Sequence, residues 1–476
     1  MSVLSEINPD VRRIKISEHD ILDERAEQIR TEIRQGLVKR YKDVIDVSSG
    51  NPHGMGLKPL TFVRQVLATC FYPSLVHDES LPLDVRQRAQ SLLAECDGES
   101  IGSYPATYGM KHVRSSVSTF ITRRDGVVSD PDNIIISNGS QHALILILKL
   151  LVQGRGLQQT GVLTPVPCYR SFNKALVAQG AVSVPYYLCE EQGWTVQVEE
   201  LRRALQAARG HCNPMVLYLI NPGNPSGHVQ SKASIEEVIR FAAEERLFIM
   251  ADEVYQGCVF GKDSEFYSYK KVLSEMGPPY STNVELASFH SVSKGFMGEC
   301  GLRCGYVEMV NLDPQVMRYA YQAFSINALA SVPGQITLDV MLNPPEPGDP
   351  SYAVYAQEVK SVMSAIKNNA QRIMDVVSGL PGMTCQPING GIFMFLRLHL
   401  SKAAIEHAEE KDLEPDLLYS MRLLEDTGLC VAPGCELRQK QGTHHIRICL
   451  ATPEEIMEDV LHRLKSFHLR FIKEFP

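Results

Sequence analysis

Short apolar runs alternate along the chain with longer stretches in which apolar residues recur every three or four positions. Each short run holds four or five residues between turn-forming residues, which is typical of a buried strand. The runs are Asn133–Ile136, Gly161–Thr164, Val216–Ile220, Leu247–Ala251, Leu286–Phe289 and Gly305–Met309. Because strands that alternate with helices form mostly parallel sheets, the pattern predicts an α/β fold with helices on both faces of such a sheet.

A stretch rich in proline and glycine interrupts the alternation at residues 342–350. Such a density of turn formers marks a domain boundary or a surface loop. A single apolar stripe then predicts a long helix from Tyr352 to Val377. We expect residues 51–345 to form a large domain and residues 346–476 to form this linking helix and a small domain. Residues 1–50 would form an N-terminal arm and part of the small domain.

The composition favours a large soluble protein with a sizeable core. Of the 476 residues, 44% are hydrophobic and 21% are charged, and the formal net charge is −8. This charge gives no electrostatic case for a nucleic-acid or membrane partner. The first ten residues resemble neither a signal peptide nor a transit peptide, and no apolar run reaches the length of a membrane span. We therefore expect a cytoplasmic protein.

The 12 cysteines include no Cys-x-x-Cys pair. This pattern is typical of reduced thiols in a cytosolic protein. Cys300 and Cys304 are close in sequence, but two lone thiols lack the other ligands that a metal needs. We therefore expect no metal site.

A lysine, Lys294, stands between the small residues Ser293 and Gly295. A lysine that bonds covalently to a carbonyl-containing cofactor needs a partly desolvated site without a firm salt-bridge partner, and small neighbours let a ring approach. Taken alone, such a lysine is most often a solvated surface residue. The polar residues that accompany it favour the catalytic interpretation.

Asn224, Asp252 and Tyr255 each follow closely on an apolar run. Open parallel sheets bind ligands at the edge where such residues lie. A buried Asp252 would keep a pyridine nitrogen protonated, while Tyr255 and Asn224 would hydrogen-bond a phenolic oxygen. Individually, Asp252 could be a turn or a helix cap and Asn224 a turn residue. Together with Lys294 they predict an enzyme that uses pyridoxal 5'-phosphate.

The phosphate of such a cofactor is best held where a helix begins, because free backbone amides and the helix dipole favour an anion there. Ser140 and Gln141 follow a predicted strand and open an apolar helix. Ser291 and Arg303 flank Lys294 and can add a hydroxyl and a guanidinium. A Gly-Ser turn by itself needs no ligand, so this prediction depends on Lys294.

These motifs resemble those of the class I/II pyridoxal phosphate-dependent aminotransferases of fold type I. Within that family the chain is most similar to the alanine aminotransferases, from Asn8 to Ser466–His468, in blocks such as Pro59–Val66, Ile121–Asp125 and Asn283–Ser291. The resemblance implies a mostly parallel, seven-stranded sheet in a large cofactor-binding domain, together with a smaller α+β domain.

The resemblance also implies roles for further residues. Tyr169 would stack on the cofactor ring, and Tyr104 would reach the phosphate of the neighbouring subunit in a homodimer with shared active sites. Arg447 would clamp the substrate α-carboxylate, with Gly50 and Asn224 beside the substrate. Without the resemblance, Tyr169 is more simply a buried strand-end residue and Arg447 an outward-facing strand residue.

The chain departs from the usual alanine aminotransferase pattern in segments that include Gly50, Phe172, Cys304 and Ile326. One of them, Tyr169-Arg-Ser-Phe172, stands where that group usually shows Tyr-Pro-Leu-Tyr. The other segments are Ser48–Pro52, Asn138–Gln141, Arg303–Tyr306 and Ile326–Ala330. The residues expected to bind the cofactor match the family pattern. The departures therefore bear on which substrate is bound.

The resemblance implies a ping-pong transfer of the α-amino group from an L-amino acid to a 2-oxo acid, with L-alanine and 2-oxoglutarate giving pyruvate and L-glutamate. Lys294 would act as general base and acid at the substrate Cα. Three alternatives stay open. They are an aminotransferase with another amino donor, a carbon–sulfur lyase on the same scaffold, and a non-catalytic protein that keeps the fold.

Overall fold

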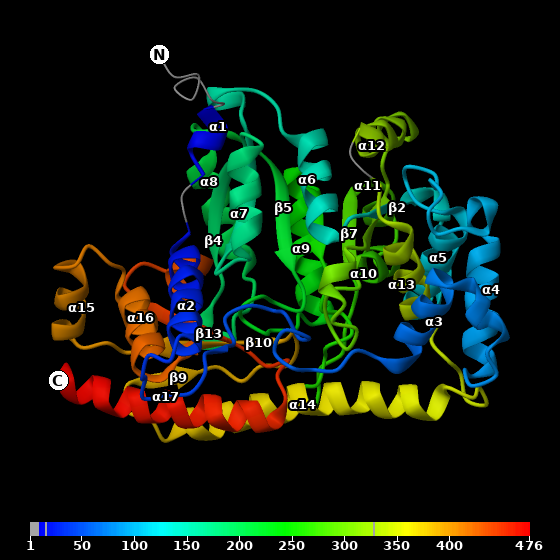
Figure 1. Cartoon of the computed structure of the whole chain (residues 1–476). Helices are drawn as coiled ribbons and strands as arrows, with labels where there is room; N and C mark the ends of the chain where they lie inside the picture. Colours follow the sequence, from blue (N-terminus) through cyan, green and yellow to red (C-terminus); the bar gives the residue numbers. More distant parts are fainter. Residues whose placement is uncertain (1–8, 15–16, 327–328) are drawn as a thin grey trace, which may run out of the picture.

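The computed structural model describes residues 9–14, 17–326 and 329–476 (Figure 1). The strands are Ile45–Asp46 (β1), Ile134–Ser137 (β2), Thr160–Val166 (β3), Val182–Tyr187 (β4), Asn213–Ile220 (β5), Phe248–Asp252 (β6), Leu286–Ser291 (β7), Gly305–Val310 (β8), Met383–Cys385 (β9), Phe393–Leu398 (β10), Leu429–Cys430 (β11), Ala432–Pro433 (β12) and His444–Cys449 (β13). The helices are Pro9–Arg12 (α1), Glu18–Arg34 (α2), Thr61–Phe71 (α3), Leu83–Ala94 (α4), Lys111–Asp125 (α5), Ser140–Leu151 (α6), Arg170–Ala178 (α7), Val198–Ala208 (α8), Lys232–Glu245 (α9), Tyr269–Glu275 (α10), Tyr280–Asn283 (α11), Pro314–Ile326 (α12), Val332–Leu342 (α13), Tyr352–Ser378 (α14), Lys402–Glu409 (α15), Pro415–Thr427 (α16) and Glu454–Glu474 (α17).

The larger sheet has seven strands within the described residues, in the order β2-β8-β7-β6-β5-β3-β4. β8 runs antiparallel to both of its neighbours, and the other pairs are parallel. The predicted mostly parallel sheet is therefore confirmed. The sequence pattern missed the edge strand β4, because its burial is mixed and it contains Pro185, a residue that weakens a strand prediction.

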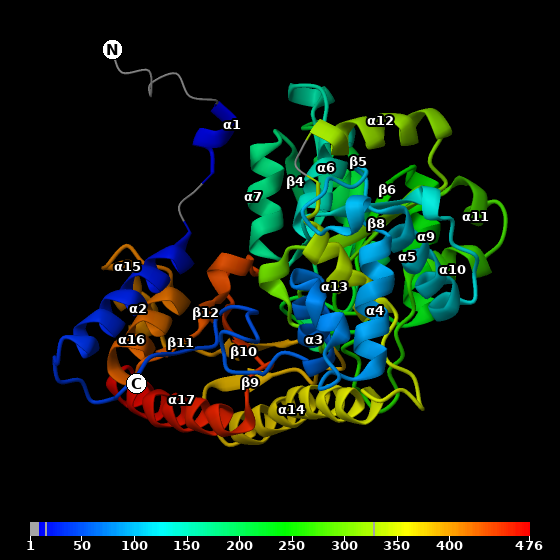
Figure 2. The same ribbon diagram turned by 45° about the vertical axis from the view of Figure 1, so that its right-hand side comes forward.

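Helices cover both faces of this sheet (Figures 1 and 2). Successive strand residues point to opposite faces. Leu217 and Ile249 pack in a core with α8, α9 and α10. Val216 and Met250 pack in another core with α6, α7 and α12. The strands are therefore buried on both sides, which explains their continuous apolar runs.

The second, smaller sheet is antiparallel, in the order β12-β13-β10-β9. The predicted long helix is confirmed as α14, which lies beside α17 along the lower side of the molecule in Figure 1. The N-terminal helix α2 packs on α16 through Leu22, Ala26 and Ile29. β1 also joins this part of the chain, because it pairs with β11. Among the described residues, no helix has the length and apolar character needed to cross a membrane.

Candidate active site

A cavity of about 270 Å³ lies where the carboxyl ends of β5 and β6 meet the smaller sheet. β5, β6 and β7 are neighbours, so the segments that follow them in sequence are brought to one edge. The cavity lining includes the predicted residues Gly50, Ser140, Tyr169, Asn224, Asp252, Tyr255, Lys294 and Arg447. The topology thus joins residues that are up to 397 positions apart in sequence, namely Gly50 and Arg447.

Lys294 is held in this cavity by a backbone carbonyl. Its Nζ donates a hydrogen bond of 2.9 Å to the oxygen of Gly50, and in the described part of the chain it forms no ion pair. Burial lowers its pKa. A Cβ at Gly50 would lie 2.9 Å from this Nζ and 2.8 Å from the Phe393 ring, so the position requires glycine. A desolvated amine without a carboxylate partner suits covalent chemistry.

Asp252 ends β6 and is 5% exposed. Burial raises its pKa to about 6, and a hydrogen bond of 2.9 Å from the Tyr218 hydroxyl opposes that rise. A buried carboxylate at this position would be stabilised by a cationic partner. The ring nitrogen of a protonated pyridine is such a partner, so the carboxylate fits the predicted cofactor.

Arg447 lies on β13 with its guanidinium 4.0 Å from the centre of the Phe393 ring. It donates to Asn224 Oδ1 at 3.2 Å and to the carbonyl of Ser48. Its Nε is buried without a hydrogen-bond partner, and no carboxylate of the described residues pairs with it. Burial lowers its pKa to about 10. The arginine is therefore not an outward-facing strand residue, and its open donors suit a bound carboxylate.

Tyr255 and Tyr169 are each positioned by an amide side chain. Asn224 Nδ2 lies 3.3 Å from the Tyr255 hydroxyl, and both residues are buried. The Tyr169 hydroxyl donates a 2.6 Å hydrogen bond to Gln141 Oε1. Gln141 is not part of the cavity lining, so it contacts the site through Tyr169.

The predicted phosphate ligands meet at the start of α6. Gly139, just before Ser140, has φ +87°, and a Cβ there would lie 2.7 Å from Arg303 Nη2. A Cβ at Gly305 would lie 2.9 Å from the Ser140 nitrogen and 3.0 Å from Ser291 Cβ. Ser140, Ser291 and Arg303 therefore surround one helix start, where backbone amides favour an anion.

Several other predicted positions lie outside the cavity lining. Tyr104 is 85% exposed. Phe172 is buried and stacks on Tyr218 at 3.6 Å, while Cys304 is buried in a core. Ile326 is exposed at the end of α12, and residues 327 and 328 lie outside the described residues. Among these departures from the usual pattern, Phe172 can influence the cavity through Tyr218, on which it stacks and which hydrogen-bonds Asp252.

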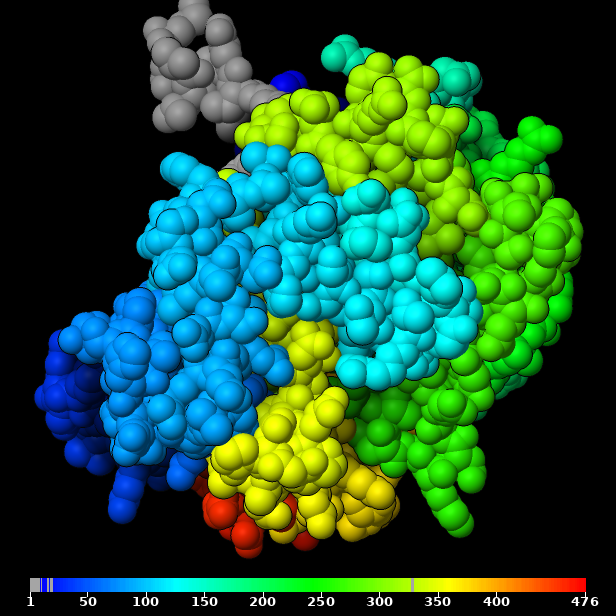
Figure 3. Space-filling view, turned by 90° about the vertical axis from the view of Figure 1, so that its right-hand side faces the viewer, coloured from blue at the N-terminus to red at the C-terminus, as the bar shows by residue number. Residues whose placement is uncertain are grey.

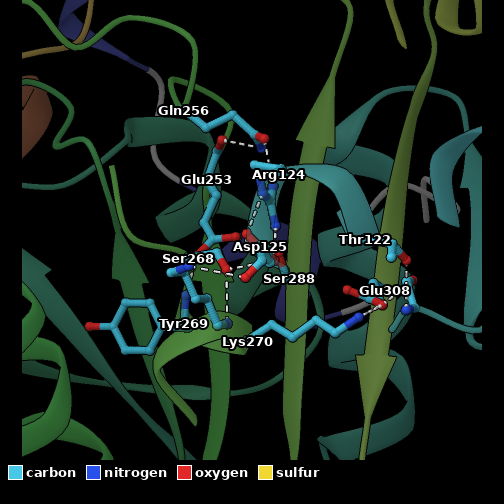
Figure 4. A network of polar contacts seen from close by, with 12 residues as sticks. Thr122, Arg124, Asp125, Glu253, Gln256, Ser268, Tyr269, Lys270, Ser288 and Glu308 are labelled. Carbon is cyan, nitrogen blue, oxygen red and sulfur yellow. Dashed lines mark hydrogen bonds and ion pairs between the residues drawn. The ribbon is translucent and has the colours of Figure 1, made fainter. Parts of the chain in front are cut away.

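A buried polar network lies beside the ends of β6 and β7 (Figure 4). Glu253 accepts hydrogen bonds from the Tyr269 nitrogen at 2.8 Å and from Ser288 Oγ at 2.6 Å. Arg124 donates through Nε and Nη2 to the two oxygens of Asp125, at 2.7 and 2.6 Å. Burial raises the pKa of Glu253 to about 7. This network fixes the strand end that carries Asp252.

Several lining residues were not predicted as site residues, among them Arg170 and Phe393. Tyr218 was also missed, although it holds Asp252. Arg170 follows Tyr169 directly in sequence. The arginine in place of the usual proline is the feature from which a role at the site could have been predicted. Phe393 and Tyr218 carry no signal of their own, because each lies inside an apolar strand.

Comparison with known proteins gives the class of the chain. The family model for aminotransferases of class I and II matches residues 42–464. The chain belongs to this family and is an aminotransferase, which confirms the resemblance read from its motifs.

Particular relatives and structures agree with that class. Alanine aminotransferase 2 of Xenopus laevis is 46% identical over 473 residues, covering 99% of this chain and 88% of the relative. Glutamate–glyoxylate aminotransferase 1 of Arabidopsis thaliana is 36% identical over 474 residues, covering 97% of this chain and 98% of the relative. The solved structure of alanine aminotransferase from Pyrococcus furiosus has a TM-score of 0.74 at 18% identity, covering 98% of this chain and 100% of that one. The expected fold type I architecture is thus confirmed.

Proposed function

We propose that the chain is a pyridoxal 5'-phosphate-dependent aminotransferase that converts L-alanine and 2-oxoglutarate to pyruvate and L-glutamate. The observation that carries this proposal is one cavity that holds a half-buried Lys294, a buried Asp252 and a buried Arg447, with no carboxylate partner for Lys294 or Arg447 among the described residues. Relatives named alanine aminotransferase, which match nearly the whole chain, support the choice of alanine.

Each residue then has a defined task. Bound pyridoxal 5'-phosphate supplies an electron sink that stabilises negative charge at the substrate Cα. Asp252 would pair with the ring nitrogen, and Tyr255 with Asn224 would hydrogen-bond the phenolic oxygen. Arg447 would orient the substrate through its α-carboxylate. The Lys294 amine would take the Cα proton and return it.

The remaining groups would hold the cofactor's phosphate and ring. We assign the phosphate to Ser140, Ser291 and Arg303, which gather at one helix start. Tyr169 would stack on the ring while Gln141 fixes its hydroxyl. Gly50 would leave room beside the substrate.

We further propose a homodimer in which Tyr104 contacts the phosphate of the partner subunit. Figure 3 shows α4, α5 and α12 together on one face of the molecule. Large apolar residues exposed in and beside these segments include Phe71, Tyr72, Leu83, Tyr104, Tyr319 and Ile326. Exposed apolar surface of this kind favours association between copies.

The domain division and the location also stay proposals. Cores that largely follow the two sheets support a large domain of residues 51–345, and a linking helix and small domain of residues 346–476. Residues 1–50 would form an N-terminal arm and part of the small domain. The 12 free cysteines support a reducing, cytoplasmic location.

A second candidate is an aminotransferase with another amino donor. The relative named glutamate–glyoxylate aminotransferase and the altered lining residues Ser49 and Arg170 favour it. In this case the mechanism is the same and only the side-chain pocket differs.

The test is the visible absorbance of the cofactor-loaded protein mixed with single amino acids, followed by identification of the keto product. We expect alanine and glutamate to convert the absorbance band and to yield pyruvate and 2-oxoglutarate. Conversion by another amino acid but not by alanine would overturn the alanine assignment. Steady release of ammonia without an oxo acid would indicate a lyase, and failure to bind the cofactor a non-catalytic protein.

A further inference from the structure

Arg170 is a second arginine at the Lys294 cavity. It is the first residue of α7, follows Tyr169 directly, and belongs to the cavity lining together with Arg447. Its positive charge is one of the influences that lower the pKa of Arg447. Among the described lining residues, the one carboxylate is Asp252, which is held by Tyr218. Two arginines therefore line one small cavity.

The guanidinium of Arg170 is only loosely tethered. Its Nη1 donates to Ser17 Oγ at 3.3 Å and lies 3.7 Å from Glu436 Oε2, beyond hydrogen-bond distance. The Glu436 side chain is 4% exposed and accepts a hydrogen bond from Ser17 Oγ. An arginine has five N–H donors in a planar fork. Most of the Arg170 fork can therefore turn to a bidentate ligand.

We propose that Arg170 binds the side-chain carboxylate of a dicarboxylic substrate while Arg447 binds its α-carboxylate. This inference rests on the proposed aminotransferase function and names the residue that recognises the larger substrate. A buried carboxylate needs a charged, hydrogen-bonded partner, whereas the methyl group of alanine needs none. The dicarboxylic substrate class is that of glutamate and 2-oxoglutarate.

The Glu436 contact explains how one pocket accepts both substrates. When alanine or pyruvate is bound, Glu436 compensates the charge of Arg170. When a dicarboxylate is bound, its distal carboxylate takes the fork at shorter distance than the 3.7 Å of the Glu436 pair. Arg170 stands where the alanine aminotransferase pattern usually has proline.

The experiment measures each half-reaction separately, as the rate constant for conversion of the bound cofactor divided by the apparent dissociation constant. In Arg170→Leu we expect the ratio of glutamate to alanine efficiency to fall by about 10- to 100-fold, because a charge-assisted fork is lost. Arg170→Lys restores charge without the planar fork and should recover part of that ratio. An unchanged ratio in Arg170→Leu would overturn the proposal.

Glu436→Gln separates substrate recognition from a merely structural ion pair. If Arg170 serves only to hold α7 to Glu436, the glutamine variant should reproduce the defect of Arg170→Leu for both substrates alike. On our proposal it frees the fork, so the glutamate-to-alanine ratio is kept or rises. Equal loss in both variants would overturn the assignment.

Failure of the proposed function gives a different result. If the wild-type protein does not convert alanine, the alanine reaction is wrong, and the same ratio is then measured against whichever monocarboxylic amino acid the protein converts. If the wild type does not convert glutamate while it converts alanine, the dicarboxylate assignment of Arg170 is wrong. The two proposals can therefore fail independently.

Discussion

At the scale of single residues, burial sets the chemistry of this site. It lowers the pKa of Lys294 and raises that of Asp252, so each group is pushed toward its neutral form. A neutral amine can act as nucleophile and base, and a carboxylate under this pressure is stabilised by a cation brought to it. The same penalty on Arg447 makes a carboxylate ligand favourable there.

Lys294→Ala tests the residue on which the assignment depends. We expect kcat to fall by at least about 10²- to 10⁴-fold, because the group that moves the Cα proton is removed. The measurement is steady-state transamination with a coupled assay for the keto product. Lys402→Ala, whose side chain is 88% exposed on α15, is a matched control that should keep activity. Full turnover by Lys294→Ala would sink the proposed mechanism.

At the scale of elements, the start of α6 requires a glycine. Gly139→Ala introduces a Cβ at φ +87° and 2.7 Å from Arg303 Nη2, so the guanidinium must move away from the helix start. We expect the dissociation constant for pyridoxal 5'-phosphate to rise by about tenfold. Gly126→Ala is the control, since it has φ +69° with no atom within 4 Å of its Cβ. That variant should lose stability but keep cofactor affinity; equal affinities in both would contradict the assignment.

The network at the ends of β6 and β7 should appear in the pH dependence of stability. Burial raises the pKa of Glu253 from 4.5 to about 7, so the folded state binds more protons than the unfolded state between these values. The effect of Glu253 on the free energy of unfolding is therefore most favourable below about pH 4.5. It becomes less favourable as the pH rises to 7, by about 3 kcal/mol in total.

Glu253→Gln removes this titrating group. Urea unfolding at pH 5 and pH 7.5 should show a smaller loss of stability in the variant than in the wild type. An identical pH dependence in both proteins would show that Glu253 does not titrate in this range.

These elements also show how far the sequence could lead. In the seven-stranded sheet, the apolar runs located every strand except the edge strand β4, because strands buried on both faces have a distinctive pattern. The polar residues that follow those runs include Ser140, Asn224, Asp252, Tyr255 and Lys294 of the cavity lining. Tyr218 and Phe393 could not be predicted, since their contacts with Asp252 and Arg447 depend on which strands and sheets become neighbours.

At the scale of the whole molecule, the proposed active site takes residues from two subunits. Tyr104 is 85% exposed and outside its own cavity lining, so the role proposed for it requires a second copy. We expect Tyr104→Ala to weaken cofactor binding and lower activity, because a phosphate contact is lost. This effect alone does not reveal which subunit's site Tyr104 serves.

Mixed dimers settle that point. If Tyr104 acts across the interface, a dimer of one Tyr104→Ala and one Lys294→Ala subunit has both defects in one site and neither in the other. Random reassociation of equal amounts makes about half of the dimers mixed, so activity should recover to about one quarter of wild type. If Tyr104 acts within its own subunit, each site of the mixed dimer carries one defect, and mixing restores nothing. Wild type mixed with Lys294→Ala should keep one half of wild-type activity whether or not subunits exchange, so exchange is checked separately by capturing an untagged subunit through a tagged one.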